Sequence, residues 1–477
     1  MNITRRQLIK TGAMSAAALA LAPVTGGWST IRPRTVAPLT FRPYPHPLMP
    51  PVEFVYAADQ NSDPFKSPIQ ITQEGIVVPE EVGDRPFSIN TKWFIEGFGY
   101  VWLGADNSGQ LYTQEDFSQS RPLNLNVEFA KSRVARNRDV LARYRKAGTA
   151  FSTEVKYLDD LSQELLVDAM KAQGERAGKL ADQSLLYALW AGEKTELEHA
   201  RSRIERQKRK EQVYFGCETR QYVWAKNVDM MEAFTDLFNY ATVTHYVYDT
   251  WYELFEPRRG EYNFGIKDDI VNWLLENDIT IEGRPLFWFH PWVTPDWLRQ
   301  MSFDELKGYV VQHTQDVVGH YGDKILHWEV VNEYHDWANL FRHTPEQITE
   351  ITRLACETTH DVNPKVQRII NNCCPFAEYV ARGHDSGVTM TEQGPPIDRP
   401  LRSPRQYIQD ITEAGVPFEI LGVQIYFPER DLSDIVRMVE RMEAFNKPIY
   451  VTEMGASSGP TSLDIMKGAE VPGAPYD

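Results

Sequence analysis

Cysteine is scarce in this chain, since its 477 residues include only four, at positions 217, 356, 373 and 374. Four cysteines are too few for a disulfide scaffold in a chain of this length. The adjacent pair Cys373 and Cys374 also lacks zinc-finger spacing, and no second Cys or His pair completes a metal site. We therefore expect buried or incidental thiols, and we expect neither a metal nor another cofactor.

Positive charge is also in deficit. The 50 Lys and Arg residues are outnumbered by 66 Asp and Glu residues, which gives a formal net charge of −16. Nucleic acids and anionic membranes are bound through basic surfaces. We therefore expect neither as a partner, and a neutral ligand fits the composition better. The sequence does not predict the oligomeric state.

No apolar run is long enough to cross a membrane. The stretch from Ala13 to Ala22 is far shorter than the ~20 residues that a membrane-spanning helix requires. It follows the pair Arg5-Arg6, and paired arginines before a short Ala-rich segment are typical of a twin-arginine export signal. We expect residues 1–30 to be this signal and the protein to be periplasmic or extracellular.

The pattern of the chain changes three times after the signal. Residues 31–52 are rich in proline and predict an extended linker. Residues 53–129 contain short alternating segments, such as Phe87–Ile95 and Leu123–Phe129, and predict a small β-sandwich. Residues 130–212 carry apolar positions at helical spacing and predict a helical connector. Residues 213–477 then alternate between strands and helices.

This last part predicts a parallel sheet with helical crossovers, either doubly wound or a barrel. No glycine-rich phosphate loop follows its first strand, which weighs against a nucleotide-binding fold. The expected strands are Val213–Cys217, Ala241–Val247, Arg284–Phe289, Ile325–Val331, Val366–Ile370, Ile420–Tyr426 and Pro448–Thr452. The expected helices include Met230–Phe238, Ile266–Leu275, Asp304–Val318 and Pro345–Thr358.

Two of these strands end in a glutamate. Asn332-Glu333 follows the strand from Ile325, and Glu453 follows the strand from Pro448. In a barrel, the carboxyl ends of the strands form the rim where catalysis takes place. Two carboxyl groups at that rim, about 5–5.5 Å apart, are what retaining glycoside hydrolysis needs. A lone strand-end glutamate would more often be a solvated rim residue, but a matched pair favours a catalytic site.

The segment Trp328–Glu333 resembles the Trp-Asp-Val-Val-Asn-Glu acid/base motif of glycoside hydrolase family 10, the endo-β-1,4-xylanases, with Glu329 in place of Asp. The resemblance covers residues 213–455 and implies a (β/α)₈ TIM barrel. Further segments follow in the family's order, namely Phe238-Asn239, Glu256–Phe264, Gly283–Trp288, Thr294–Trp297, Gly422–Gln424 and Thr452-Glu453.

The resemblance also implies roles for single residues. Glu333 would be the acid/base and Glu453 the nucleophile. Asn332 would hold the 2-hydroxyl of the reacting sugar, and Gln424 and Tyr426 would lie near the nucleophile. The remaining implied substrate contacts are Trp288, His290 and Trp292, although Trp288 also fits a barrel core and Trp292 also fits loop packing.

The chain departs from the family pattern at three places. Thr244-His245-Tyr246 replaces the Glu-Asn-x-Met-Lys run that grips distal sugars, and Tyr426 replaces a histidine that contacts the nucleophile. The 477 − 453 = 24 residues after Glu453 have the composition of a loop, so we expect strand 8 to be missing and the chain to be C-terminally truncated.

Three functions remain open from the sequence. The first is a retaining hydrolase of a β-1,4-linked glycan, with xylan as the first candidate. The second is a retaining hydrolase of the same superfamily that acts on another β-glycan. The third is a non-catalytic glycan-binding protein. The sandwich would either bind glycan or act as a structural brace.

Overall fold

The structure is a computed structural model, and it describes residues 37–118, 121–206, 213–219, 228–248, 254–383, 398–426 and 429–455. The export signal predicted for residues 1–30 and the loop predicted from residue 456 onward lie outside these ranges. Within them, no helix combines the length and apolar character that a membrane span requires.

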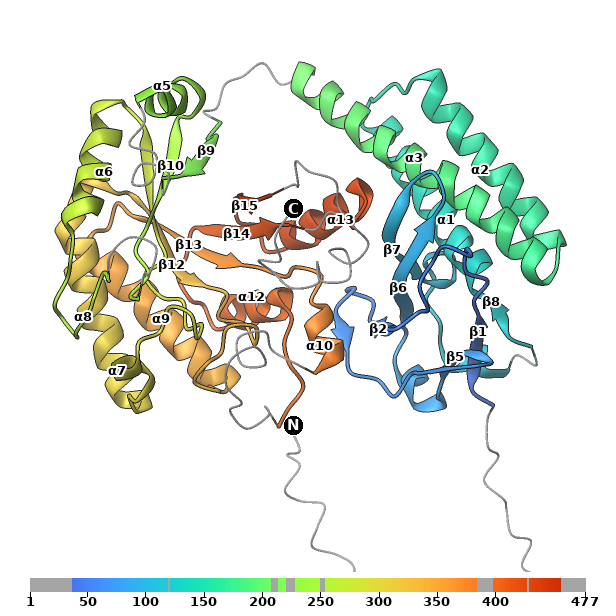
Figure 1. The fold of residues 1–477 in the computed structure, drawn as a ribbon, viewed down its shortest axis with the longest axis horizontal. Helices are drawn as coiled ribbons and strands as arrows, with labels where there is room; N and C mark the ends of the chain where they lie inside the picture. Colours follow the sequence, from blue (N-terminus) through green and yellow to red (C-terminus); the bar gives the residue numbers. More distant parts are fainter. Residues whose placement is uncertain are drawn as a thin grey trace, which may run out of the picture. The chain divides into compact units, whose positions relative to one another are not determined.

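A parallel sheet of seven strands forms the centre of the second half of the chain (Figure 1). The order in the sheet is β15-β14-β13-β12-β11-β10-β9, so each strand pairs with its neighbour in sequence. A doubly wound sheet would reverse direction at a switch point, and this sheet does not. The strands are β9 (Gly216–Glu218), β10 (Tyr240–Thr244), β11 (Thr280–Arg284), β12 (His327–Asn332), β13 (Gln367–Asn372), β14 (Ile420–Ile425) and β15 (Ile449–Met454).

The sheet is curled as part of a barrel, with β9 and β15 as its edges. The rings of Tyr214, just before β9, and Tyr450, on β15, lie only 6.2 Å apart. The two edges therefore approach each other at the amino-terminal ends of the strands. This sheet contains the seven predicted barrel strands, and none of the described residues forms an eighth strand of it.

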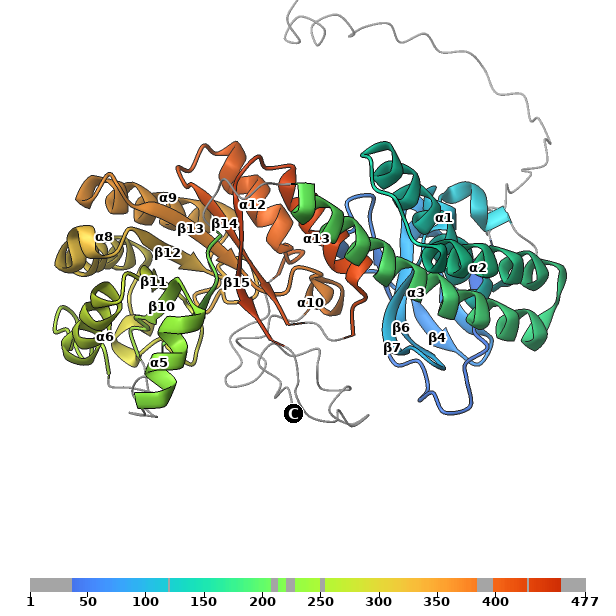
Figure 2. The ribbon, with the colours of Figure 1, turned by 90° about the horizontal axis from the view of Figure 1, so that it is seen from above.

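Helices follow the strands and lie outside the curled sheet (Figure 2). Three of them begin with a capping box, in which Ser302, Thr344 or Ser403 exchanges hydrogen bonds with the residue three positions later. The helices are α5 (Val228–Leu237), α6 (Gly265–Glu276), α7 (Asp296–Arg299), α8 (Phe303–Tyr321), α9 (Pro345–Val362), α10 (Glu378–Arg382), α12 (Pro404–Glu413) and α13 (Leu432–Glu443).

The interior of the sheet is filled by large side chains that need small neighbours. Trp328 on β12 is fully buried. A Cβ atom at Gly283 on β11 would lie only 2.3 Å from the Trp328 ring. Glycine at position 283 is therefore required for the indole to occupy the barrel interior.

The first part of the chain contains two four-stranded sheets and three long helices. The first sheet has the order β4-β5-β1-β8 and the second β3-β2-β6-β7. The strands are β1 (Leu39–Arg42), β2 (Tyr56–Ala58), β3 (Pro64–Phe65), β4 (Gln70–Thr72), β5 (Gly75–Val78), β6 (Ser88–Ile95), β7 (Gly99–Ala105) and β8 (Leu123–Asn124). The helices are α1 (Leu125–Lys146), α2 (Thr153–Lys171) and α3 (Gly174–Arg206). The predicted β-sandwich is not confirmed by this arrangement, and the division into domains stays a prediction.

Three element predictions were wrong. The segment Leu39–Arg42, predicted as linker, forms β1 by pairing with β5 and β8. The segment from Leu125 to Phe129, predicted as a strand, is the first turn of α1, because the Asn124 side chain caps it by accepting from the Val127 backbone. The strand predicted at Arg284–Phe289 lies earlier, at Thr280–Arg284; Pro285, which has no N–H, interrupts the ladder, but the Leu286 and Phe287 N–H groups still donate to β12.

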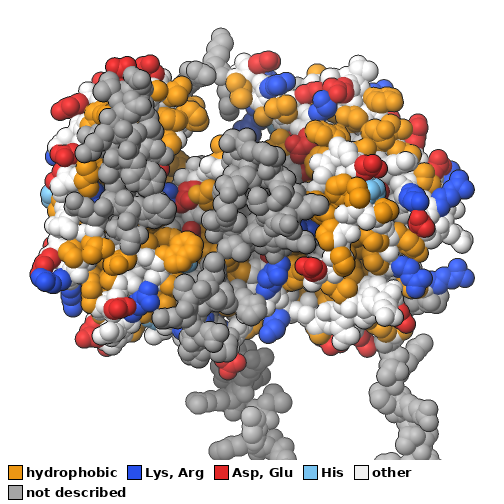
Figure 3. Space-filling view, viewed as in Figure 1, with side chains coloured by type: hydrophobic (Ala, Val, Ile, Leu, Met, Phe, Trp, Pro, Cys, Tyr) orange, Lys and Arg blue, Asp and Glu red, His pale blue; other side chains and the backbone are white. Residues whose placement is uncertain are grey.

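Buried ion pairs join helix α1 of the first part to helix α13 beside the sheet. Arg133 lies 2.7 Å from Asp431, and Arg136 lies 2.6 Å from Asp434. On the face drawn in Figure 3, by contrast, acidic and basic side chains are interspersed with apolar ones. The four cysteines are free thiols, and all except the half-buried Cys217 are buried.

Candidate active site

The two predicted glutamates lie at the same rim of the sheet. Glu333 directly follows β12, and Glu453 is the penultimate residue of β15. Glu333 has a left-handed backbone, with φ of 55°. This conformation is costly for a residue with a side chain, and such strain gathers at functional sites. The left-handed backbone of Glu333 turns the chain out of strand β12 immediately after Asn332.

Glu333 is buried and held by two neutral donors. Trp288 Nε1 donates to Glu333 Oε2 at 2.8 Å, and Gln424 Nε2 donates to Oε1 at 2.7 Å. Burial and the nearby charge of Glu453 raise the pKa of Glu333 to about 7, against the opposing effect of the two hydrogen bonds. Glu333 can therefore carry a proton near neutral pH. Gln424 and Tyr426, two residues apart at the end of β14, bond to Glu333 and Glu453 respectively and so hold the two carboxyl groups at the same rim.

Glu453 has a different set of partners. An Arg284 guanidinium nitrogen donates to Glu453 Oε1, and the Tyr426 hydroxyl donates to Oε2. The side chain of Glu453 keeps 17% of its surface exposed. Tyr426, predicted to replace a family histidine, thus lies against Glu453. The hydroxyl and the guanidinium fix both carboxylate oxygens and leave part of the group accessible.

Arg284 and Glu329 were not among the predicted site residues. Arg284 Nε lies 3.4 Å from Glu329 Oε2, and Asn371 Nδ2 donates to the same oxygen at 3.0 Å. Glu329 is fully buried, and this burial raises its pKa. Arg284 therefore joins Glu329 inside the sheet to Glu453 at the rim. Both residues lie in sequence segments that resemble the family. Only Glu329 differs from the family motif there, because it stands in place of the aspartate.

Asn332 and Gln424 complete the amide side of the site. The Asn332 side-chain oxygen accepts from Gln424 Nε2 at 3.4 Å, and both residues are buried. The same Gln424 nitrogen also bonds to Glu333. The structure therefore brings Asn332, Glu333 and Gln424 together, with the Gln424 side chain bonded to Glu333 rather than to the expected nucleophile Glu453, and their roles toward a substrate stay predictions.

Asn371 at the end of β13 links the strands that carry these groups. Its side-chain oxygen accepts from Thr452 Oγ1 at 2.6 Å, next to Glu453. A Cβ atom at Gly422 on β14 would lie 2.7 Å from this oxygen. Glycine at position 422 thus leaves the space through which β13 supports β15.

The aromatic residues that follow β11 pack against one another. Trp288 donates to Glu333, as described, and its ring stacks on His290 with centroids 4.7 Å apart. His290 is 4% exposed and accepts from the backbone N–H of Trp292. Burial, followed by the charge of Arg299, lowers the pKa of His290 to about 4. His290 is therefore a neutral support for Trp288. Trp292 is 50% exposed, which suits a stacking surface.

The site has the groups for acid–base and nucleophilic chemistry. No group of three or more His, Cys, Asp and Glu side chains that could hold a metal occurs within the described ranges. A protonated carboxyl beside a second carboxylate, with amide, indole and hydroxyl donors around them, can give a proton to one atom while attacking another.

Residues 204–381 match the family described as glycosyl hydrolase family 10. Among curated proteins, the chain is 26% identical over 180 residues to a protein named β-1,4-xylanase from Dictyoglomus thermophilum, covering 36% of this chain and 44% of the relative. It is 25% identical over 234 residues to endo-1,4-β-xylanase B from Thermotoga neapolitana, covering 46% of this chain and 60% of the relative. The chain thus spans less than two thirds of either protein.

Solved structures also show similarity to this chain. One is a family 10 structure from Paenibacillus barcinonensis, with 19% identity, a TM-score of 0.39, and coverage of 53% of this chain and 74% of that chain. Another is native xylanase 10B from Thermotoga maritima, with 21% identity, a TM-score of 0.40, and coverage of 54% and 75%.

Proposed function

We propose that the chain, whose residues 204–381 match glycosyl hydrolase family 10, hydrolyses a β-1,4-linked glycan with retention of configuration. Xylan is the first candidate substrate, because the curated relatives are named xylanases. The observation that carries the proposal is the unequal environment of the two carboxyl groups at one rim. Glu333 is buried with a pKa of about 7, and Glu453 is held by Arg284 and Tyr426.

In the first step, Glu453 acts as the nucleophile. Its carboxylate oxygen attacks the anomeric carbon, and the bond to the leaving glycosidic oxygen breaks. Glu333 gives its proton to that oxygen, so that the leaving sugar departs as a neutral alcohol. The raised pKa of Glu333 supports this role, because a proton must still be present near neutral pH.

In the second step, Glu333 acts as a base. It takes a proton from water, whose oxygen attacks the anomeric carbon and releases the Glu453 carboxylate. In this proposal Asn332 binds the 2-hydroxyl, a contact that strengthens in the transition state. The exposed Trp292 offers a ring on which a further sugar can stack.

The full architecture we propose is a (β/α)₈ barrel. The observed order runs without interruption from β9 to β15, and these two strands are the edges of the sheet. An eighth strand of a closed barrel would pair with both. Export by the twin-arginine route also stays a proposal, which fusion of residues 1–30 to a reporter protein would test in strains with and without that route.

The test of the proposed function is the release of reducing ends from xylan and from other β-1,4-glycans. Glu333→Gln and Glu453→Gln should each lower release by at least ~10³-fold, because each removes a group required in the transition state. The first product should have the β configuration when observed by NMR before mutarotation. An α product, or full activity in both variants, would contradict the assigned roles.

A further inference from the structure

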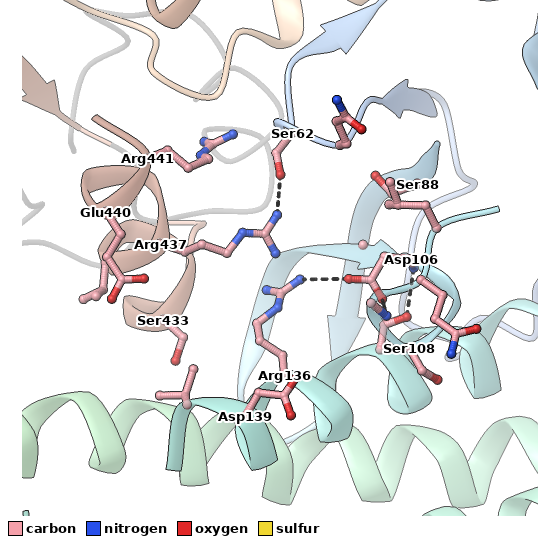
Figure 4. A pocket seen from close by; sticks show the side chains of 18 of the residues that line it. Ser62, Ser88, Asp106, Ser108, Arg136, Asp139, Ser433, Arg437, Glu440 and Arg441 are labelled. Atoms are coloured by element: carbon pink, nitrogen blue, oxygen red, sulfur yellow. Dashed lines mark hydrogen bonds and ion pairs between the residues drawn. The ribbon is translucent and has the colours of Figure 1, made fainter. Parts of the chain in front are cut away.

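A polar cleft of about 600 Å³ lies between the first part of the chain and helix α13, away from the candidate active site (Figure 4). A smaller cavity of about 40 Å³, lined by several of the same residues, adjoins it. We refer to these as the outer cleft and the inner cavity. Neither contains Glu333 or Glu453 in its lining.

The inner cavity is lined by four arginines and one carboxylate. The arginines are Arg136 from α1, Arg430 just before α13, and Arg437 and Arg441 on α13, and the carboxylate is Asp434. Figure 4 shows Arg136, Arg437 and Arg441 extending from two different helices toward the same space. Convergence of guanidinium groups from separate elements is unfavourable unless negative charge balances it.

Two of the four arginines are balanced by carboxylates of the chain. Arg136 lies 2.6 Å from Asp434 and 3.9 Å from Asp106. Arg430 forms an ion pair with Glu378 and lies 3.6 Å from Asp434. These carboxylates thus compensate Arg136 and Arg430.

The other two arginines have only uncharged partners. Arg437 donates to the Ser62 hydroxyl at 2.5 Å, and Arg441 donates to the Asn61 carbonyl oxygen at 2.8 Å. Within the part of the chain that the structure describes, no carboxylate forms an ion pair with either of them. The buried Nε atom of Arg441 has no hydrogen-bond partner there. Arg437 and Arg441 therefore lack a carboxylate in direct contact, although Asp434 acts on both of them at longer range.

The lowered pKa values of Arg437 and Arg441 agree with the absence of a carboxylate in contact with them. The charge of Arg136, followed by burial, lowers the pKa of Arg437 to about 10. Burial lowers the pKa of Arg441 as well. A guanidinium with a lowered pKa is one whose charged form is destabilised by its surroundings, and a bound anion would reverse that effect.

We propose that the inner cavity binds an oxyanion group, a carboxylate or a phosphate, through Arg437 and Arg441. The volume suits one such group, since 40 Å³ holds about three waters at roughly 10–15 Å³ each. Guanidinium groups bind both anions through paired N–H donors. The outer cleft is lined by hydroxyl and amide side chains, including Ser88, Asn90, Ser108 and Gln110, and also by charged side chains, among them Asp59, Asp106, Asp139, Glu196, Glu440 and Arg143. These groups would bind the hydroxyls of a larger ligand, such as an acidic sugar.

The test is a titration of the full chain, with inorganic phosphate, glucuronate and neutral xylose as separate ligands. The ionic strength is held constant with sodium chloride, and both the melting temperature and the heat of binding are measured. A ligand of the folded state raises the melting temperature progressively with its concentration, whereas the heat of binding saturates. We expect saturable binding of phosphate, of glucuronate or of both, and no response to xylose at the same concentrations.

Paired variants identify the site. Arg437→Gln/Arg441→Gln should weaken anion binding at least tenfold. Arg138→Gln/Arg258→Gln should bind as the wild type does, because these side chains are 72% and 79% exposed, line neither cavity, and their replacement makes the same change in net charge. Arg437→Lys serves if the double variant fails to fold, and it should retain binding with reduced affinity.

The outcomes separate the sources of the anion. Binding of glucuronate alone identifies an acidic sugar, and binding of phosphate alone identifies a phosphate group. Binding of both identifies the shared oxyanion chemistry. Absence of saturable binding to the wild type, or equal binding by the Arg437→Gln/Arg441→Gln variant, overturns the proposal. Neither result bears on glycan hydrolysis, because the experiment measures binding alone.

Discussion

At the scale of single residues, the candidate site distributes its hydrogen-bond donors unevenly between two carboxyl groups. Glu333 receives an indole and an amide, which are both neutral, and it lies in a buried position. Glu453 receives a guanidinium and a phenol. Environments that differ in this way allow two identical side chains to act as acid and as nucleophile.

The pH dependence of activity should follow Glu333. With a pKa of about 7, the proton needed in the first step is lost as the pH rises through 7, so kcat/KM should fall on the alkaline side of that value. The Gln424 hydrogen bond favours the charged form, and Gln424→Leu should therefore move this limb to higher pH. Gln409→Leu, on α12 away from the site, should leave the limb unchanged. A shift to lower pH in Gln424→Leu would contradict the assignment.

Arg284 should affect stability and activity in separable ways. Arg284→Met leaves the fully buried Glu329 without its cation, and such a loss costs about 3–5 kcal/mol of unfolding free energy. Arg284→Met/Glu329→Met removes both partners and should recover much of that loss in urea denaturation. Activity should stay low in both variants, because Glu453 has lost its guanidinium in each. Recovery of activity together with stability would show that Arg284 acts only on folding.

The strand-end glutamates could be predicted from the sequence because each follows an apolar strand in a recognisable motif. Arg284 could not, because an arginine at a strand end is usually solvated, and its burial depends on Glu329 and Glu453 from two other strands. His290 was predicted to contact substrate; its ring stacks on the Trp288 indole, and the substrate contact stays a prediction. The burial of Arg284 depends on contacts between distant strands, and the local spacing of residues in the sequence does not reveal such contacts.

At the scale of elements, the position of β15 depends on side chains between neighbouring strands. Asn371 on β13 accepts from Thr452 on β15, across the glycine at position 422 on β14. The site therefore requires close approach of three consecutive strands. A single added methyl group at the middle strand would disturb the strand that carries Glu453.

Gly422→Ala should accordingly lower both stability and activity. The added Cβ would lie 2.7 Å from the Asn371 side-chain oxygen and 2.9 Å from Thr452, and overpacking of this kind costs about 1–3 kcal/mol. Gly308→Ala is the matched control, since nothing lies within 4 Å of its added Cβ in helix α8. That change should stabilise the protein by up to about 1 kcal/mol. Thermal melting and kcat measured on both variants provide the comparison.

Most helices and strands of the barrel part could be predicted, because their apolar periodicity agrees with their final burial. α9 begins at Pro345 as predicted, since the Thr344 capping box marks its first turn. The first turn of α1 was mistaken for a strand, because Leu125 and Phe129 fit both a period of two and a helical spacing of four. Strand β1 escaped prediction because its four residues are defined by pairing with distant strands rather than by a local pattern.

At the scale of the whole molecule, the first part of the chain and helix α13 share buried charges. Arg133 and Asp431 lie 2.7 Å apart, with only 3% and 1% of their side chains exposed. Asp431 also caps the first turn of α13 by accepting from the Asp434 backbone. Loss of the arginine would leave a buried carboxylate without its partner at the start of this helix.

Arg133→Met should therefore destabilise the protein by about 3–5 kcal/mol. The control is Arg143→Met, which breaks a pair between the same two helices where Arg143 is 53% exposed, and it should cost less than about 1 kcal/mol. Urea denaturation of both variants gives the comparison. Equal losses would mean that burial of the Arg133–Asp431 pair does not determine its contribution.

The proposed double displacement predicts a covalent intermediate on Glu453. A β-xylobioside with fluorine at carbon 2 and a reactive leaving group should transfer its sugar to the nucleophile, because the fluorine slows both steps while the reactive leaving group speeds only the first, so that the intermediate accumulates. Mass spectrometry of the digested protein should then locate one added fluoroglycosyl group on Glu453, and Glu453→Gln should remain unlabelled. A label on another residue, or glycan hydrolysis without any label, would contradict the assignment of Glu453 as the nucleophile of a retaining hydrolase.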